Sequence, residues 1–530
     1  MSVGALLLGT LAAAPSPAPT PAVAAIRWGA CPDRPVPAPA SLRCGTLRVP
    51  LDPTAPAKTA KATVAVALAR LPATGPPARR IGSLVLNFGG PGAPGIATLA
   101  ADPNAFAELN KRYDLVVFDP RGVGLSEPVT CGDSGGDGGG GGGGDGVSGG
   151  AATAVGEDPG GDDDPAGDDP AADTPAAQLA ALRAAAARCA RESGPVLPYI
   201  GTVHVARDMD LVREALGEDE LDFLGFSYGT RLGAVYAALF PRHTGRMVLD
   251  GVDTLSEPLA EQALMSAAGQ QRALDNFLVW CAHRQACVYG TNTRTAKEKV
   301  LALVTRLDAE PLTGGGGMSF TGQDVVEAIG VALYSPKMWP ALADALARVE
   351  DHGDPVGLMQ LGGPADPPPE ERADHHGTEV PGDNARAALV AVNCADDPDR
   401  GDDKASPAAV AREIEALAPV FRAASPVFGP RQLMTVLACY GRPAGTDFIR
   451  RIDHPAGIPR MLLVGTRGDP ATPYEWTEET AQRLGNAVVL DYKGEGHTGY
   501  LSSPCVRGYV DHFLIDGRLP SGTRSCPADT

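Results

Sequence analysis

Ser227 lies in the stretch "LDFLGFSYGT" (221–230), with Gly225 and Gly229 two positions to either side. The apolar residues before it predict a buried strand, and those after it predict a helix. A G-x-S-x-G pattern between a strand and a helix is typical of a strained turn that exposes a nucleophilic hydroxyl. A serine alone is a poor nucleophile, so this chemistry also requires a base and an acid that orients the base.

The base should be a histidine in a loop that follows a late strand, at the carboxyl edge of the predicted sheet. Of the nine histidines, His497 meets this condition, because "YKGEGHTGY" directly follows the strand-like run "AVVLDY". His512 falls inside a predicted terminal helix, and His243 follows the helix after the turn, one strand too early. We therefore expect His497 to be the general base.

The acid should follow the strand before that one, since the order serine, acid, histidine is typical of α/β-hydrolases. Asp469 in "MLLVGTRGDPATPYEW" has this place. Asp491 is the competing choice, but it ends the next strand and is close to His497 in the chain. Thr472 and Glu475 have the spacing of a capping box, which predicts that Thr472 is the N-cap of the following helix.

Acyl transfer further needs two N–H donors for the oxyanion that develops on the substrate, each contributing about 3 kcal/mol to transition-state stabilisation. We expect one from the backbone of Tyr228, directly after the nucleophile. The other should come from the glycine-rich loop in "NFGGPG", where glycine lets the backbone approach the substrate. Gly90 is our choice in that loop, with Gly89 as the alternative.

The elements that would position these residues alternate between strands and helices. Continuous apolar runs are typical of strands covered on both faces, as in a parallel sheet between helices. The sequence therefore predicts an α/β fold with a mostly parallel central sheet flanked by helices, of the α/β-hydrolase type. The predicted strands are "CGTLRVPLD", "ATVAVALARL", "GSLVLNF", "YDLVVFD", "LDFLGF", "RMVLDGV", "RMLLVGT" and "AVVLDY".

The pattern of the chain divides it into segments. We expect a signal peptide over 1–25, a first part of the hydrolase core over 26–254, a mainly helical cap over 255–450 and the rest of the core over 451–530. Within the first part, residues 132–176 are almost entirely Gly, Asp, Ala and Pro, and predict a disordered acidic insertion. The spacing in this insertion is not that of a calcium-binding loop.

Composition and charge narrow the class of protein. The net charge of −19 argues against nucleic acid as a partner, because phosphate binding needs basic patches. The N-terminus has an apolar core over 5–14 and small residues near 22–25, which predicts a cleaved secretory signal and a secreted protein. No later segment is apolar enough to predict a membrane span. We expect a monomer.

Ten cysteines suit an oxidising compartment, and none has the spacing of a zinc site. Pairing cannot be derived from sequence alone, but each consecutive pair falls within one segment, so we expect sequential pairing. The expected disulfides are Cys31–Cys44, Cys131–Cys189, Cys281–Cys287, Cys394–Cys439 and Cys505–Cys526. The chemistry above requires neither a metal nor an organic cofactor.

Several motifs resemble those of secreted tripeptidyl aminopeptidases, which are α/β-hydrolase serine exopeptidases related to proline iminopeptidases. The resemblance implies a catalytic triad of Ser227, Asp469 and His497, and peptide substrates with a free N-terminus. It covers nearly the whole chain and is weakest in the acidic insertion and the cap. The motifs are "IRWGACP", "CGTLRVPLD", "NFGGPGAPG", "VVFDPRGVGLSEP", "LGFSYGTRLGAVYAALFP", "RMVLDGV" and "GTRGDPATPYEW".

The chain departs from the family pattern at three positions near the predicted site. Phe88 replaces the usual Pro, Pro94 the usual Ser, and Thr498 the usual Gly. We expect these side chains to line the site and to affect specificity more than activity.

Other functions are compatible with the same residues. A proline iminopeptidase, or an esterase or lipase, could use the same triad, because a fold does not fix a substrate. A catalytically inactive binding module is an alternative of another class, although such proteins usually lack a triad residue. A cap carboxylate that binds the substrate's amino group is expected of an exopeptidase, but the sequence does not indicate which one.

Overall fold

The structure, a computed structural model, describes residues 25–31, 39–54, 62–132, 174–285, 287–313, 319–362, 380–399, 404–442, 445–522 and 524–528. The predicted signal peptide and nearly all of the predicted acidic insertion lie outside these residues. The predicted division into domains stays a prediction.

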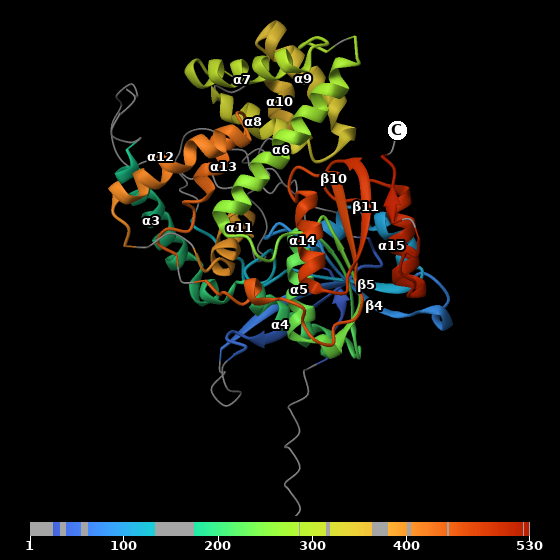
Figure 1. The fold of residues 1–530 in the computed structure, drawn as a ribbon. Coiled ribbons are helices and arrows are strands. Elements are labelled where there is room, and N and C mark those ends of the chain that lie inside the picture. The colour runs from blue at the N-terminus through green and yellow to red at the C-terminus, as the bar shows by residue number, and fades with distance from the viewer. Residues whose placement is uncertain are drawn as a thin grey trace, which may run out of the picture.

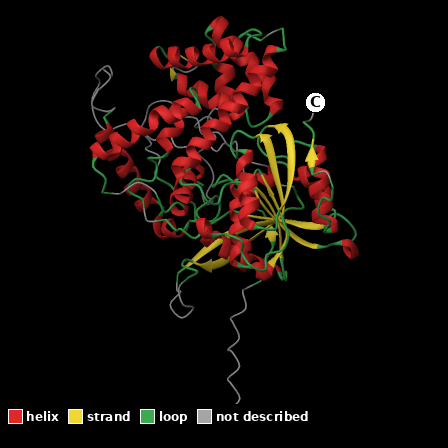
Figure 2. Ribbon diagram, viewed as in Figure 1, coloured by secondary structure: helices red, strands yellow, loops and turns green. Residues whose placement is uncertain are grey.

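The strands lie together below a large group of helices in Figure 2. They form a ten-stranded sheet in the order β1-β2-β3-β5-β4-β6-β7-β10-β11-β12. The first four strands in this order pair antiparallel, and all pairs from β5 to β12 are parallel. The strands are β1 (Gly29–Ala30), β2 (Arg43–Pro50), β3 (Thr63–Leu71), β4 (Gly82–Asn87), β5 (Tyr113–Phe118), β6 (Leu221–Phe226), β7 (Thr244–Asp250), β10 (Leu462–Gly468), β11 (Val488–Glu495) and β12 (Ser525–Cys526). The predicted mostly parallel α/β fold is confirmed.

Helices cover both faces of this sheet because its central strands are apolar on both sides. Along β4, Leu84 and Leu86 pack on one face, and Val85 packs on the other. The first face is covered by α1 (Gly95–Ala101), α2 (Ala107–Asn110) and α15 (Pro504–Asp516). The second is covered by α4 (Thr202–Leu216), α5 (Tyr228–Leu239) and α14 (Tyr474–Leu484).

Between β7 and β10 the regular secondary structure of the described residues is mainly helical and lies over the sheet, with α7 to α10 farthest from it (Figure 1). One short hairpin, β8 (Leu312–Thr313) with β9 (Ser319–Phe320), interrupts the helices. The helices are α6 (Leu259–Ala282), α7 (Thr293–Ala309), α8 (Gly322–Ala332), α9 (Trp339–His352), α10 (Val356–Gly362), α11 (Asn384–Asp396), α12 (Pro407–Ala424) and α13 (Gly429–Thr435). We refer to this region as the cap.

Helix α3 (Pro175–Glu192), which follows the acidic insertion, was not predicted from the sequence. It precedes the core helix α4 in the chain but packs against α12 of the cap, where Leu179 joins Val410, Leu437 and Tyr440 in a small apolar cluster. Its alanine-rich sequence has a weak apolar pattern, so this tertiary contact is what gives it a buried face.

The five disulfides join the cysteines in the predicted sequential pairs, and no described cysteine is free. Cys394–Cys439 links α11 to the chain that follows α13, so it fixes two parts of the cap to each other. In the part of the chain that the structure describes, no helix has the length and apolar character needed to cross a bilayer.

Candidate active site

Ser227 lies in the turn between β6 and α5, as the G-x-S-x-G pattern predicts, and its backbone is strained. Its φ of 55° and ψ of −128° are unusual for a residue with a side chain. A Cβ on Gly225 would lie 2.5 Å from the carbonyl oxygen of Gly229, and one on Gly229 would lie 2.8 Å from that of Asn87. Both glycines are therefore required by the close packing of this turn.

Asp469 and His497 lie in contact beyond the carboxyl ends of β10 and β11. His497 Nδ1 is 2.9 Å from both Oδ1 and Oδ2 of Asp469, and both side chains are buried. Asp491, the competing acid, is instead paired with Arg467 at 2.9 Å.

The carboxylate of Asp469 is held by further donors from its own loop. The Oδ1 atom accepts hydrogen bonds from the N–H groups of Ala471 and Thr472, both at 2.8 Å. The Thr472 hydroxyl donates to Oδ2 at 3.0 Å. The capping box predicted for Thr472 is therefore wrong: α14 begins at Tyr474 with Pro473 as its N-cap, because the Thr472 side chain is bound to Asp469.

The net effect of the surroundings raises the pKa of His497 above its ordinary value. Burial lowers this pKa, but the negative charges of Asp469, Asp250 and Asp253 outweigh it. Nε2, the other ring nitrogen, is buried and has no hydrogen-bond partner among the described residues. An imidazole fixed at Nδ1 with a free Nε2 has the arrangement that a general base needs.

The Ser227 hydroxyl and His497 Nε2 share no hydrogen bond among the described residues, although the end of β7 lies beside both residues. The Ser227 N–H donates to the carbonyl of Asp250 at 3.0 Å. A Cβ on the next residue, Gly251, would lie 3.4 Å from Cε1 of His497. Bonds between a nucleophile and its base are often long in free enzymes and shorten when substrate binds.

The glycine-rich loop after β4 lies directly against the turn that carries Ser227. A Cβ on Gly89 would lie 2.9 Å from Cβ of Ser227 and 3.2 Å from the backbone nitrogen of Tyr228. The Gly89 N–H donates to Asn87 Oδ1 at 3.0 Å, whereas the N–H of Gly90 has no acceptor among the described residues. The backbone N–H of Gly90 is therefore available to a substrate oxyanion, whereas that of Gly89 is already bonded to Asn87.

Tyr228, the other expected donor, is the first residue of α5, so its N–H has no acceptor within the helix. Its phenol points into a buried polar network, because its hydroxyl is 2.5 Å from Oγ1 of Thr202, which donates to Asp396 at 2.5 Å. Burial raises the pKa of Asp396 to about 6. The network anchors the start of α5 to the end of α11 in the cap.

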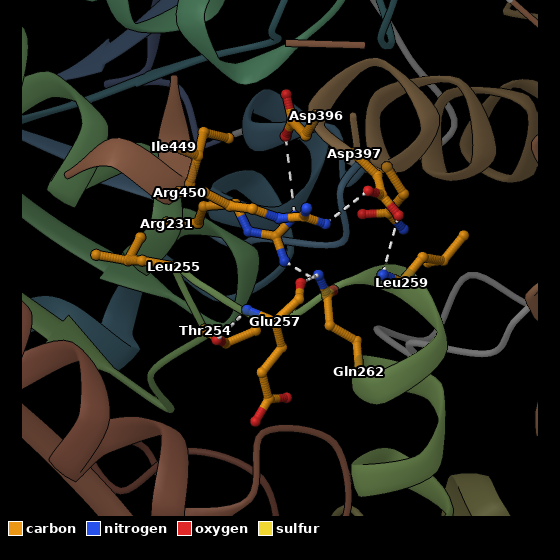
Figure 3. Close-up of a pocket in the computed structure, with 11 residues that line it drawn as sticks. Arg231, Thr254, Leu255, Glu257, Leu259, Gln262, Asp396, Asp397, Ile449 and Arg450 are labelled. Carbon is orange, nitrogen blue, oxygen red and sulfur yellow. Dashed lines mark hydrogen bonds and ion pairs between the residues drawn. The ribbon is translucent and has the colours of Figure 1, made fainter. Parts of the chain in front are cut away.

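A small pocket lies beside this network, between α5, the start of α6 and the end of α11 (Figure 3). Arg231 of α5 donates to Asp253 and Gln262, each at 3.0 Å, and lies 3.8 Å from Asp396. The cavity is about 20 Å³, which is room for one water molecule. It is therefore too small to be the peptide-binding cleft.

Three cap elements contact the site, and the sequence indicated none of these contacts. The carbonyl of Tyr334, just after α8, accepts the His497 N–H at 2.8 Å, and its ring is 5.0 Å from the imidazole. On α11, Ala385 and Ala388 pack on the glycine-rich loop at Gly92. On α6, Gly269 packs against Pro473, in the loop that carries Asp469.

Of the three departures from the family pattern, Phe88 is the one that packs in the cluster of aromatic rings around Phe226. Its side chain is buried in the core, with its ring stacked on Phe226 at 6.0 Å. Thr498 is buried beside the site with a φ of 68°, in the left-handed region that favours glycine. Pro94 is the N-cap of α1.

No group of three His, Cys, Asp or Glu side chains in the described ranges is arranged to bind a metal ion. The geometry instead combines a half-buried serine in a strained turn, an imidazole bound to a carboxylate, and two backbone N–H groups without an acceptor among the described residues. This combination suits acyl transfer by covalent catalysis.

Comparisons with known proteins identify the family of the chain. Residues 82–348 match the family described as alpha/beta hydrolase fold, and residues 425–526 match the family described as TAP-like protein. The serine protease Hip1 of Mycobacterium tuberculosis is 32% identical over 502 residues, which cover 92% of this chain and 88% of that protein.

Two further relatives have different described activities. Carboxylesterase B of Mycobacterium tuberculosis is 34% identical over 91% of this chain and 86% of its own length. The tripeptidyl aminopeptidase of Streptomyces lividans is 30% identical over 92% of this chain and 84% of its own length. The chain is therefore a serine hydrolase that belongs to the tripeptidyl aminopeptidase-like family of α/β hydrolases.

Proposed function

We propose that this protein is a secreted serine exopeptidase that releases short peptides, three residues long, from free N-termini. Ser227 is the nucleophile, His497 the general base and Asp469 the acid that orients it. The observation that carries the proposal is the buried His497–Asp469 pair, with contacts of 2.9 Å at Nδ1 and a free Nε2.

In the proposed reaction, Ser227 Oγ attacks the carbonyl carbon of the scissile peptide bond and gives its proton to His497 Nε2. The N–H groups of Tyr228 and Gly90 stabilise the oxyanion. His497 then returns the proton to the leaving amine, and the acyl-enzyme remains on Ser227. Water, deprotonated by the same imidazole, releases the peptide acid and restores the serine.

The cap supports exopeptidase action rather than cleavage within a chain. Tyr334, α11 and α6 each contact a different loop of the site, so the cap lies over the site from several sides. A long N-terminal extension of the substrate would have to pass these contacts. The similarity to a tripeptidyl aminopeptidase supports the release of three residues.

Export is part of the proposal, and the five disulfides support it because such bonds persist in oxidising compartments. N-terminal sequencing of protein recovered from the culture medium tests it. We expect the mature chain to begin near residue 26, and intact protein retained in the cytoplasm would contradict export.

Digestion of a mixture of random peptides, analysed by mass spectrometry, tests the substrate class. We expect three-residue products from free N-termini and none from the same peptides after N-acetylation. Ser227→Ala is the control for contaminating peptidases, and Ser256→Ala, in the loop before α6, is the matched control. Cleavage of acetylated peptides at a comparable rate would contradict exopeptidase action.

An esterase is the second candidate, because Carboxylesterase B is among the relatives with the highest identity given above. The two functions share the acyl-enzyme and differ in the leaving group. The kcat/KM for p-nitrophenyl esters, divided by the kcat/KM for peptide anilides, distinguishes an esterase from an exopeptidase. We expect the anilide with a free amino group to be preferred to its acetylated form, a difference that an esterase would not show.

A further inference from the structure

Asp250, the last residue of β7, contacts the loops of both Ser227 and His497. Its carbonyl oxygen accepts the Ser227 N–H at 3.0 Å. Its carboxylate accepts the N–H of Gly499 at 2.8 Å through Oδ1 and that of Tyr500 at 2.7 Å through Oδ2. The side chain is fully buried. Asp250 therefore bonds both to Ser227 and to the loop that carries His497.

We propose that Asp250 is a positioning residue that fixes His497 relative to Ser227. This inference rests on the proposed function, in which these two residues exchange a proton. Asp250 touches no reacting atom. Its carbonyl accepts the N–H of Ser227. Its carboxylate bonds to the backbone of the loop after β11, residues 496–500, which we call the histidine loop.

The histidine loop needs such a support because it leaves the regular sheet at Glu495. Gly496 has a φ of 93° and Thr498 a φ of 68°, so no regular hydrogen-bond ladder can hold this segment. Its N–H groups are bound individually instead. That of His497 goes to the Tyr334 carbonyl, and that of Thr498 lies 3.3 Å from Asp469.

The next two N–H groups, of Gly499 and Tyr500, both go to Asp250. Tyr334 of the cap and Asp469 thus bind the N–H groups of the first half of the histidine loop. Asp250, at the end of β7, binds those of the second half. Of these three supports, Asp250 is the one that is also bonded to Ser227. Without its carboxylate, only the remaining contacts would fix the distance between Ser227 and His497.

The negative charge of Asp250 also acts on the imidazole. Burial lowers the pKa of His497, and the charges of Asp469, Asp250 and Asp253 raise it. Asparagine has nearly the shape of aspartate, but its amide group would face one of the two N–H donors and has no charge. Asp250→Asn therefore weakens the support and removes the charge while it changes the volume little.

The test compares kcat, KM and the pH profile of kcat/KM for Asp250→Asn and wild type. We expect kcat to fall about 100-fold, as displacements of about 1 Å can cause, with KM near the wild-type value. We also expect the acid limb of the profile to move to lower pH, since the pKa of His497 falls when this carboxylate is neutralised. A purely structural role would not move that limb.

Asp222→Asn is the matched control. Asp222 is a partly buried carboxylate near the amino end of the central strand β6, where it accepts the N–H of Arg246 at 2.7 Å and the hydroxyl of Tyr113 at 2.9 Å. Its variant loses a partly buried, hydrogen-bonded carboxylate at the end of the strand opposite to the site. We expect it to lower the thermal midpoint and to keep the wild-type profile.

The inference is overturned if Asp250→Asn keeps wild-type kcat, or loses kcat with the acid limb unmoved. If this variant does not fold, Asp250→Ser replaces it, because serine has no amide donor to oppose Gly499 and Tyr500, and the same outcomes decide. Failure of the proposed function has a separate signature: His497→Ala would keep its activity. An inactive His497→Ala beside a wild-type-like Asp250→Asn would contradict the positioning role alone.

Discussion

The imidazole of His497 is held by the carboxylate of Asp469 at 2.9 Å from both oxygens, although the residues are 28 positions apart. The carboxylate cannot rotate freely, because Ala471 and Thr472 donate three further hydrogen bonds to it. The pair fixes the ring orientation and the tautomer that leaves Nε2 able to accept a proton.

Replacement of the acid should therefore act on kcat. We expect Asp469→Asn to lower kcat about 10⁴-fold at neutral pH, because the amide favours the wrong tautomer of His497. Asp491→Asn is the control, since this carboxylate pairs with Arg467 away from the imidazole. Steady-state kinetics on a free-amine peptide anilide measures both. A larger loss for Asp491→Asn would show that the acid has been misassigned.

The pH dependence should follow the charge state of His497. The imidazole acts as a base only when neutral, and its pKa is raised in the folded protein. Activity should therefore be present at high pH and be lost as the pH falls through a pKa above the ordinary value of about 6.5. A profile of kcat/KM from pH 5 to 9 measures this limb. An acid limb below the ordinary value would contradict the described surroundings.

The glycine-rich loop should tolerate no side chain at Gly90. A Cβ there would lie 2.7 Å from the nitrogen of Gly92 and 2.9 Å from that of Ala93, and the φ of 102° disfavours other residues. We expect Gly90→Ala to displace the oxyanion donor and to lower kcat about 100- to 1000-fold.

Gly508→Ala in α15 is the control for Gly90→Ala, because a Cβ at this position would meet nothing within 4 Å. We expect wild-type kcat and a gain of up to about 1 kcal/mol in the free energy of unfolding. Wild-type kcat in Gly90→Ala as well would remove Gly90 from the oxyanion hole.

The cap disulfide Cys394–Cys439 should contribute more stability than the short Cys281–Cys287 bond. The two bonds close loops of 45 and 6 residues, for which loop-closure entropy gives about 4 and about 2 kcal/mol. We expect the double alanine variant at 394 and 439 to have a lower midpoint in urea unfolding than the double alanine variant at 281 and 287. It should also lose activity, since α11 packs on the glycine-rich loop. The reverse order of midpoints would contradict this account.

Most of the fold could be predicted from the sequence because its signals are local. Continuous apolar runs identified central strands such as β4 and β5, and β6 with its glycine pattern located the turn of Ser227. The two-residue strands β1 and β12 were not predicted. The order of strands then selected Asp469 and His497, since the carboxyl ends of parallel strands meet at one edge.

Contacts made between distant segments could not be predicted in the same way. Thr472 had the spacing of a helix cap, but its hydroxyl bonds to Asp469. Tyr334 reaches His497 from the cap, and no pattern near Tyr334 indicates it. Asp250 did have a signal, because it ends the apolar run "RMVLD" at the same edge as the site. Its two partners nevertheless depend on the path of the loop after β11.

The proposed reaction requires that His497 activates the hydroxyl of Ser227. Reaction of the folded protein with a fluorophosphonate, followed by peptide mass spectrometry, measures this activation at the serine itself. We predict one adduct, on Ser227, which forms in wild type and Ser256→Ala and is lost in Ser227→Ala and His497→Ala. Labelling at another residue, or undiminished labelling of Ser227 in His497→Ala, would rule out Ser227 as a nucleophile activated by His497.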